Sequence, residues 1–145
     1  MIVSFFGHSS FSPKEGDLER VIALLEKEIK GESVEFYVGR YGGFDRFSFD
    51  CAKTYQKLYP NSKIVFVSPY LDVSRFKEFI EKCDGSIYPE IEKVPLKYAI
   101  IERNKWVVRQ SDLIIFYYVI AGGVGIVYDY AVSKDKKLIN LYSKG

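Results

Sequence analysis

The chain has 145 residues, of which 48% are hydrophobic and 28% are charged, and its formal net charge is +2. This length and composition are typical of one globular domain, residues 1–145, and exclude a disordered or fibrous chain. The nearly neutral charge also disfavours a protein that grips the nucleic-acid backbone, which usually carries a basic stripe, so we do not expect a nucleic-acid partner.

Targeting and metal-binding patterns are missing from the sequence. Its start, MIVSFFGHSS, lacks the basic region of a signal peptide, and the apolar run Leu113–Ala121 is too short to cross a bilayer. Cys51 and Cys83 have no metal-ligand spacing, and His8 is the single histidine. We therefore expect a cytoplasmic protein with reduced thiols and with no metal, no cofactor and no membrane partner.

Apolar runs rich in β-branched residues alternate with stripes of helical period along the chain. Ser12 and Pro13 form the clearest helix start, as a cap and a first helical residue. The predicted elements are a strand at 2–6, a helix from Ser12 to Gly31, a strand at 34–38, a helix at 44–58, a strand at 64–67, a short helix at 74–83, a minor strand at 87–88, a helix at 96–110, a strand at 113–121, a helix that follows the glycine turn at 122–125 and runs to about Ser133, and a strand at 137–141.

This alternation predicts an α/β fold, a Rossmann-like, mostly parallel sheet of about five strands with helices on both faces. In such sheets ligands bind at the carboxyl ends of the strands, where successive connections diverge. We expect the loops at 7–10, 39–45 and 121–125 to meet at this edge.

The stretch from Ser111 to Tyr130 is the strongest local signal. A buried strand leads into Gly122, Gly123, Val124 and Gly125, and a helix follows. Backbone N–H groups and the positive end of the helix dipole would face an anion there, and the missing side chains would let a phosphate approach. A similar junction follows the second strand at Gly39, Gly42 and Gly43. The alternative is a tight strand-to-helix turn, because neither junction fits GxxxxGKS/T, and no GxGxxG follows the first strand.

Polar residues near these junctions are candidates for chemistry. Arg103 lies on the inner line of its helix and needs a partner, either a ligand phosphate or carboxylate or an internal salt bridge. Asp129 comes four residues after Gly125 and can overhang the helix start, where it would bind ribose hydroxyls or stabilise a sugar cation, or it can be a solvated helix residue. Asn104 can hydrogen-bond a base or cap a loop.

The first two loops add further candidates. His8 can contact phosphate or transfer a proton, or it can be a solvent-exposed loop residue. Asp45 can serve the ligand or only complement a helix dipole. Tyr41 and Phe44 can stack on a base, or they can belong to the core or a lid.

Together these residues resemble the SLOG superfamily, the Rossmann-like group that includes the LOG (lonely guy) enzymes and the DprA-type proteins. The resemblance lies closest to small single-domain members from bacteria and phages. It is carried by Phe6-Gly7-His8, by Val38-Gly39 and Gly42-Gly43-Phe44-Asp45, by Arg103-Asn104-Lys105-Trp106-Val107 with Ser111-Asp112, and by Gly122-Gly123-Val124-Gly125. It implies a pocket for a nucleotide or a nucleotide-derived ligand, lined by Gly7, His8, Ser9, Gly39, Gly42, Gly43, Phe44, Asp45, Asn104, Gly122, Gly123, Val124 and Gly125.

Catalytic LOG enzymes are phosphoribohydrolases with a PGGxGTxxE signature and an upstream catalytic arginine, a position that Arg103 matches. Here Ala121 replaces the proline, Ile126 replaces the threonine and Asp129 replaces the glutamate. The shorter Asp129 withdraws its carboxylate by roughly 1.5 Å, and a misplacement of that size can slow catalysis roughly a hundredfold. These departures weaken the hydrolase hypothesis and leave ligand binding intact.

The leading hypothesis is therefore a sensor or sequestering module that binds a nucleotide-type small molecule, such as ADP-ribose, NAD or a nucleoside monophosphate. The alternative is an N-glycosidase, a phosphoribohydrolase or deoxyribosyltransferase, with Arg103 and Asp129 as catalytic residues. A third possibility is a structural domain that acts through protein contacts. The aromatic content of 17% further predicts a homo-oligomer, such as a homodimer.

Overall fold

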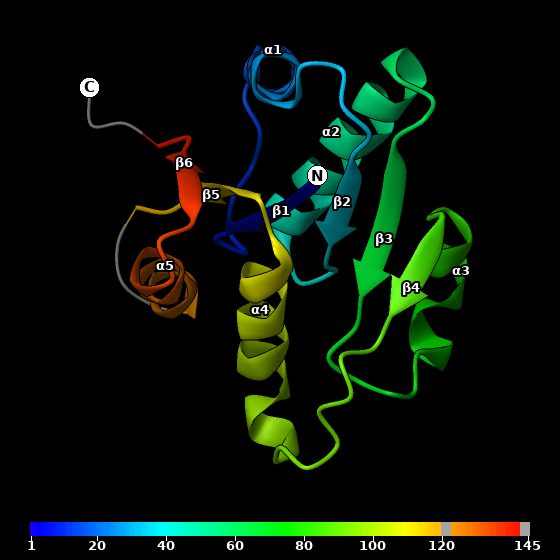
Figure 1. The fold of residues 1–145 in the computed structure, drawn as a ribbon. Coiled ribbons are helices and arrows are strands. Elements are labelled where there is room, and N and C mark those ends of the chain that lie inside the picture. Colours follow the sequence, from blue (N-terminus) through cyan, green and yellow to red (C-terminus); the bar gives the residue numbers. More distant parts are fainter. Residues whose placement is uncertain (120–122, 143–145) are drawn as a thin grey trace.

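A computed structural model describes residues 1–119 and 123–142 of the chain (Figure 1). The strands in this part are β1 (Ile2–Gly7), β2 (Glu35–Val38), β3 (Lys63–Val67), β4 (Gly85–Ile87), β5 (Leu113–Tyr117) and β6 (Lys137–Asn140). The α-helices are α1 (Asp17–Ile29), α2 (Gly43–Leu58), α3 (Lys77–Glu81), α4 (Ala99–Gln110) and α5 (Gly123–Ser133). Short 3-10 turns at Ser74–Phe76 and Leu96–Tyr98 precede α3 and α4.

The strands form one parallel sheet in the order β4-β3-β2-β1-β5-β6. In this register Val3 of β1 lies opposite Phe36 of β2 and Leu113 of β5. The predicted α/β fold is confirmed, with six strands where about five were expected. The sixth is β4, which lies close to the minor strand predicted at 87–88.

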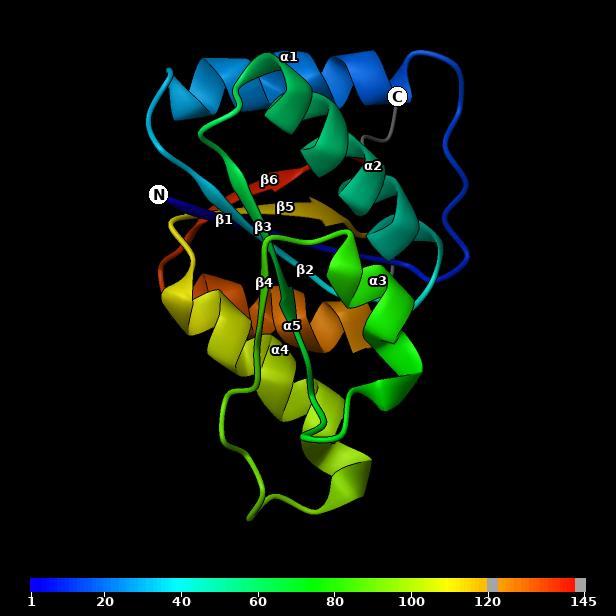
Figure 2. The ribbon, with the colours of Figure 1, turned by 90° about the vertical axis from the view of Figure 1, so that its right-hand side faces the viewer.

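Helices cover both faces of the sheet, α1, α2 and α3 on one side and α4 and α5 on the other (Figure 2). Successive strand side chains point to opposite faces, so each strand supplies both layers. On β1, Val3 and Phe5 pack beneath α1 and α2, whereas Phe6 packs against α4 and α5. Burying one such side chain stabilises the fold by about 1.5–3 kcal/mol, so the strands carry much of the core.

The first helix begins later than predicted, at Asp17 rather than near Ser12. Gly16 takes a left-handed conformation (φ 90°) before the helix, and the Asp17 carboxylate accepts the backbone N–H of Lys14 at 2.7 Å. Upstream, the ring of Phe11 packs against Phe44 and Phe47 of α2, and the residues between Phe11 and Gly16 form a loop. Tertiary contact of Phe11 therefore overrides the local Ser-Pro start signal.

The fifth strand also ends earlier than predicted, at Tyr117. The backbone N–H and C=O of Tyr118 bond the side chain of Asn140 at 3.1 and 2.9 Å, and the N–H of Val119 bonds Nε2 of His8 at 3.0 Å. Side chains, rather than the backbone of a neighbouring strand, form these hydrogen bonds. The strand therefore ends here although the sequence remains apolar. The rest of the predicted strand, at 120–121, lies outside the described residues.

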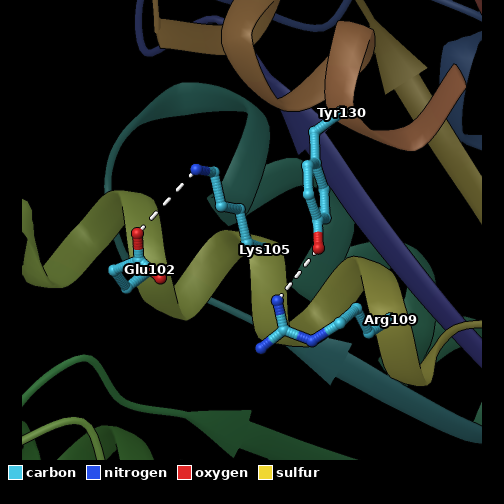
Figure 3. Close-up of polar contacts among 4 residues, drawn as sticks. All are labelled: Glu102, Lys105, Arg109 and Tyr130. Carbon is cyan, nitrogen blue, oxygen red and sulfur yellow. Dashed lines mark hydrogen bonds and ion pairs between the residues drawn. The ribbon is translucent and has the colours of Figure 1, made fainter. Parts of the chain in front are cut away.

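Helices α4 and α5 pack side by side on their face of the sheet, and polar contacts join their outer surfaces (Figure 3). Arg109 on α4 donates a hydrogen bond to the hydroxyl of Tyr130 on α5 at 3.0 Å. Lys105, paired with Glu102 on α4, also lies over the Tyr130 ring. Within residues 1–119 and 123–142, no helix combines the length and the apolar run that a membrane crossing requires.

Candidate functional site at the carboxyl edge of the sheet

The order of the strands changes direction between β1 and β5: β2, β3 and β4 follow on one side of β1, and β5 and β6 lie on the other. This arrangement creates a crevice at the carboxyl edge of the sheet. The chain leaves β1 for α1 on one face and leaves β5 for α5 on the other, so the two connections diverge. Ligands of open α/β sheets bind at such a point. A cavity of about 340 Å³ lies there, between the loops after β1 and β2, the first half of α4 and the start of α5.

The cavity brings together many of the predicted site residues. Those that line it are Gly7, His8, Ser9, Asp45, Arg103, Asn104, Gly123 and Val124. The expected convergence of the loops after β1 and β2 with the start of α5 is therefore present among the described residues. Gly122 lies outside the described residues.

Arg103 is the central side chain of this site. It is only 4% exposed, and it reaches from α4 to the carboxyl ends of two neighbouring strands. Its Nε donates to the carbonyl of Val67 at 2.8 Å, its Nη2 to the carbonyl of Val38 at 3.0 Å, and its Nη1 to Oδ1 of Asn104 at 3.0 Å. A guanidinium has five N–H donors, so these bonds leave two without an acceptor in the described part of the chain.

Asp45 faces the Arg103 guanidinium across the space that Gly39 leaves. A Cβ placed on Gly39 would lie 3.0 Å from Oδ2 of Asp45 and 3.2 Å from Nη2 of Arg103. The carboxylate also accepts the backbone N–H of Tyr41 at 2.7 Å. Burial raises the pKa of Asp45, while Arg103 and the Tyr41 N–H act in the opposite direction. Burial also lowers the pKa of Arg103, and Asp45 opposes that change, so each group stabilises the other's charge.

Three predicted ligand-binding glycines are required by packing inside the protein. A Cβ on Gly7 would lie 2.3 Å from the ring of Phe44, and one on Gly43 would lie 1.9 Å from the carbonyl oxygen of Phe11. Gly42 has φ 130° and lies against Ser9, and the N–H of Gly43 donates to the Ser9 carbonyl at 2.8 Å. These glycines let α2 begin directly against the loop after β1. Gly7 also lines the main cavity, whereas Gly42 and Gly43 do not.

Phe44 lies in the core and not at the ligand surface. It is 1% exposed and packs against the rings of Phe11, Phe47 and Tyr117. The stacking role considered for it would require this cluster to open. Tyr41, the other aromatic candidate, does line the cavity, and burial raises its pKa to about 12. The Tyr41 hydroxyl is buried without a hydrogen-bond partner among the described residues.

His8 is held by the loop that follows β5. Its Nε2 accepts the N–H of Val119, so this nitrogen is unprotonated and Nδ1 carries the proton in the neutral ring. The imidazole also packs against the rings of Tyr117 and Tyr118. His8 therefore couples the loops on the two sides of the crevice.

The structure places Asp129 away from the cavity. Helix α5 begins at Gly123 rather than after Gly125, so Asp129 lies well inside the helix and cannot overhang its start. It is exposed and is not among the described residues that line the cavity. Gly125 is buried against Tyr118, where a Cβ would lie 3.2 Å from the tyrosine hydroxyl oxygen. Asp45 is the one carboxylate on the described cavity wall.

Sequence reasoning missed the apolar side of the cavity. Ile100 and Ile101 on the first turn of α4 line it together with Val127 of α5. Ile100 and Ile101 each lie three residues before Arg103 and Asn104 on the same helix. Residues at this spacing share one side of a helix, so the sequence could have predicted that they face the same cavity. Among the described residues, no group of three or more His, Cys, Asp or Glu side chains is arranged to hold a metal ion.

Solved structures share this architecture. DNA processing protein A from Helicobacter pylori, described for its single-stranded DNA binding mode, matches with a TM-score of 0.67 at 18% identity over 99% of this chain. At this level of identity the likeness shows a shared α/β, Rossmann-like fold. TM1055, a structural-genomics target, matches with a TM-score of 0.58 at 13% identity over 99% of this chain. The chain spans 66% of the first structure and 75% of the second. Its sequence matches no family model and no curated protein.

Proposed function

We propose that the protein binds a nucleotide or a nucleotide-derived ligand in the carboxyl-edge cavity and acts as a sensor or sequestering module. The observation that carries this proposal is Arg103, a buried guanidinium on the cavity wall with two N–H donors that have no acceptor in the described residues. A ligand phosphate would accept both donors in the geometry that arginine favours.

The remaining cavity walls suit the other parts of such a ligand. Gly123 opens α5, and a Cβ placed on it would meet no described residue within 4 Å, which leaves room for a phosphate at the start of the helix. Ile100, Ile101 and Tyr41 supply apolar and aromatic surface for a base. A volume of about 340 Å³ lies within the range of small-molecule sites.

The test is one incubation of the purified protein with nucleoside monophosphates, ADP-ribose and NAD, followed by ultrafiltration. Mass detection is applied to the filtrate and to the ligand released from the denatured retentate. We expect an intact nucleotide in the retentate, with retention lost in Arg103→Lys because lysine cannot present two parallel donors. Arg109→Lys, on the outer surface of the same helix, is the matched control. Failure of all these compounds to bind below millimolar concentration contradicts the proposal.

An N-glycosidase is the second candidate, and the position of Asp45 favours it. This carboxylate lies on the cavity wall beside Arg103, where it would stabilise positive charge that develops on a ribose ring. Free base would then accumulate in the filtrate. Asp45→Asn is expected to abolish that release, whereas Asp129→Asn is expected to leave it unchanged, because Asp129 lies outside the cavity.

The homodimer and the cytoplasmic location stay predictions. Leu71 and Leu96 are 69% and 79% exposed beside a largely apolar cavity of about 490 Å³, a surface suited to a second copy of the chain. Light scattering coupled to size exclusion gives the mass in solution. A monomer at high concentration, with Leu96→Ser unchanged in elution, contradicts the dimer.

A further inference from the structure

A second, smaller cavity lies on the other side of the loop between β2 and α2. It has a volume of about 100 Å³ and is bounded by the end of β2, the first turn of α2 and α3. Arg40, Arg46, Asp45, Phe49 and Phe79 contribute its side chains. The two cavities have different linings and share Asp45 alone among their described residues, so they adjoin at this carboxylate.

Two arginines meet at this cavity without counter-ions. Neither Arg40 nor Arg46 forms an ion pair with a described residue. The Arg40 guanidinium lies 4.7 Å from the centre of the Phe79 ring, a cation–π contact that orients it. Phe79 is buried and is itself fixed by Phe49 and Phe66 at ring distances of 4.9 and 5.4 Å. One cationic group is thus held in position on an aromatic ring, which leaves its N–H edges free.

The start of α2 adds positive potential to the same space. This helix is 16 residues long, and its cap residue, Gly42, makes no side-chain cap, although the N–H of Gly43 is bonded to the Ser9 carbonyl. Asp45, the single acid on the described wall, is already engaged by the Tyr41 N–H and faces Arg103. The cavity therefore has two guanidinium groups without an ion-pair partner among the described residues, and a helix N-terminus. The carboxylate on its described wall, Asp45, already accepts a hydrogen bond from within the protein.

The choice of cation also indicates the ligand. The chain has six arginines, and four of them, Arg40, Arg46, Arg75 and Arg103, line the three cavities at this edge of the sheet. No lysine is among the described lining residues of those cavities. Arginine presents parallel donors that match the oxygens of a phosphate, whereas lysine acts as a point charge.

We propose that the smaller cavity is a phosphate-binding site in which Arg40 and Arg46 are the ligands. A volume of about 100 Å³ holds several water-sized groups and so accommodates one tetrahedral oxyanion. The phosphate is either free inorganic phosphate or a distal phosphate of the ligand proposed for the main cavity. The site stands on its own geometry, so it does not depend on which nucleotide the main cavity binds.

The experiment is a titration of the full chain with sodium phosphate, followed by two-dimensional amide NMR, with sodium chloride at matched ionic strength as reference. We expect saturable shifts confined to residues 39–46 and the facing part of α3. Arg46→Gln and Arg40→Gln are each expected to weaken binding roughly tenfold, since each removes charge-assisted hydrogen bonds. Arg75→Gln, which removes the same charge from the neighbouring cavity, is the matched control and is expected to bind as the unmodified chain does.

Two outcomes overturn the proposal: shifts that are equal in chloride, or affinities that fall equally in all three variants, since both indicate only general charge. The same variants then separate the two sources. Weaker binding of ADP-ribose, with unchanged binding of a nucleoside monophosphate, assigns the site to a distal phosphate of the ligand. Loss of inorganic phosphate binding alone assigns it to free phosphate. Phosphate binding is scored without any nucleotide, so failure here is distinguishable from failure of the main-cavity proposal.

Discussion

The β2–α2 and β5–α5 junctions both place glycines between a buried strand and a helix, yet their surroundings differ. Gly42 and Gly43 press against Ser9 and Phe11, and the N–H of Gly43 is used by a protein carbonyl. At Gly123 an added Cβ would meet no residue of 1–119 or 123–142 within 4 Å, and Gly123 lines the main cavity. A glycine at such a junction can therefore make room for another segment of the protein or for a ligand. Which of the two applies depends on the residues packed around it in the folded chain.

The two junctions are also braced differently. Arg103 holds the end of β2 through the Val38 carbonyl, next to the closely packed glycines. At the end of β5, Asn140 and His8 bond the backbone of Tyr118 and Val119. The first junction is thus built into the core, and the second is attached by polar side chains at the surface of the sheet edge. Substitutions at each junction test this difference.

The largest effect is expected for Gly43→Ala. Its Cβ would overlap the Phe11 carbonyl, and the loop would have to move and lose the Gly43 to Ser9 hydrogen bond. We expect a loss of roughly 3 kcal/mol in the free energy of unfolding, at the upper end of overpacking effects. Urea denaturation measures it. A loss below roughly 0.5 kcal/mol would mean that this junction is as open as the other.

The second largest loss of stability is expected for Arg103→Met. The variant keeps an apolar stem but leaves the carbonyls of Val38 and Val67 without their donor. We expect a loss of roughly 2–3 kcal/mol, because buried carbonyls then lack a partner. Arg109→Met, an exposed arginine on the same helix with one surface hydrogen bond, is the control and should change stability little. Equal losses of stability in the two variants would show that the hydrogen bonds of Arg103 do not stabilise the end of β2.

Asn140→Ala is expected to act on the other junction alone. It removes the bonds to both backbone groups of Tyr118, and we expect a loss of about 1–2 kcal/mol. Amide hydrogen exchange should accelerate at Tyr118 and Val119 and remain slow in β2. Asn140→Asp retains the acceptor and loses the donor, so its effect should be smaller. Uniform acceleration over the whole sheet would contradict separate bracing.

The smallest effect, and one of opposite sign, is expected for Gly123→Ala. Since no described residue lies within 4 Å of the added methyl group and the position is helical, alanine is expected to raise stability by at most about 1 kcal/mol. The same change should weaken nucleotide binding, because the methyl group enters the cavity that Gly123 lines. Stability comes from urea denaturation and affinity from calorimetry. Unchanged affinity would show that the ligand does not approach this glycine.

Much of the fold follows from local patterns. The buried runs at β1, β3 and β5 and the apolar stripes of α1 and α2 predict an alternating α/β chain, because period and burial depend on neighbouring residues. The chain order of these elements then implies the parallel sheet and its binding edge. The resemblance to the SLOG superfamily, carried by short motifs along the chain, is confirmed at the level of the fold.

Tertiary structure decided which candidates share the cavity. The pattern at the fourth helix predicted an inward Arg103, but its acceptors on Val38 and Val67 lie 65 and 36 residues away. Phe44 lies in the core because Phe11 packs against it, and Asp129 lies outside the cavity because α5 begins at Gly123. Neither the contact nor the boundary can be read from residue spacing in the sequence. The early end of β5 depends on Asn140, 22 residues downstream of Tyr118.

The sequence by itself determined the order of strands and helices, the two glycine junctions and the inward arginine, because these depend on residues within one or two helical turns. Only the tertiary structure decided that Gly43 packs against Phe11 while Gly123 lines the main cavity, and that Asp45 rather than Asp129 faces Arg103. These are contacts between segments far apart in the chain. Distances of closest approach, such as the 1.9 Å that excludes a side chain at Gly43, exist only once the segments have packed.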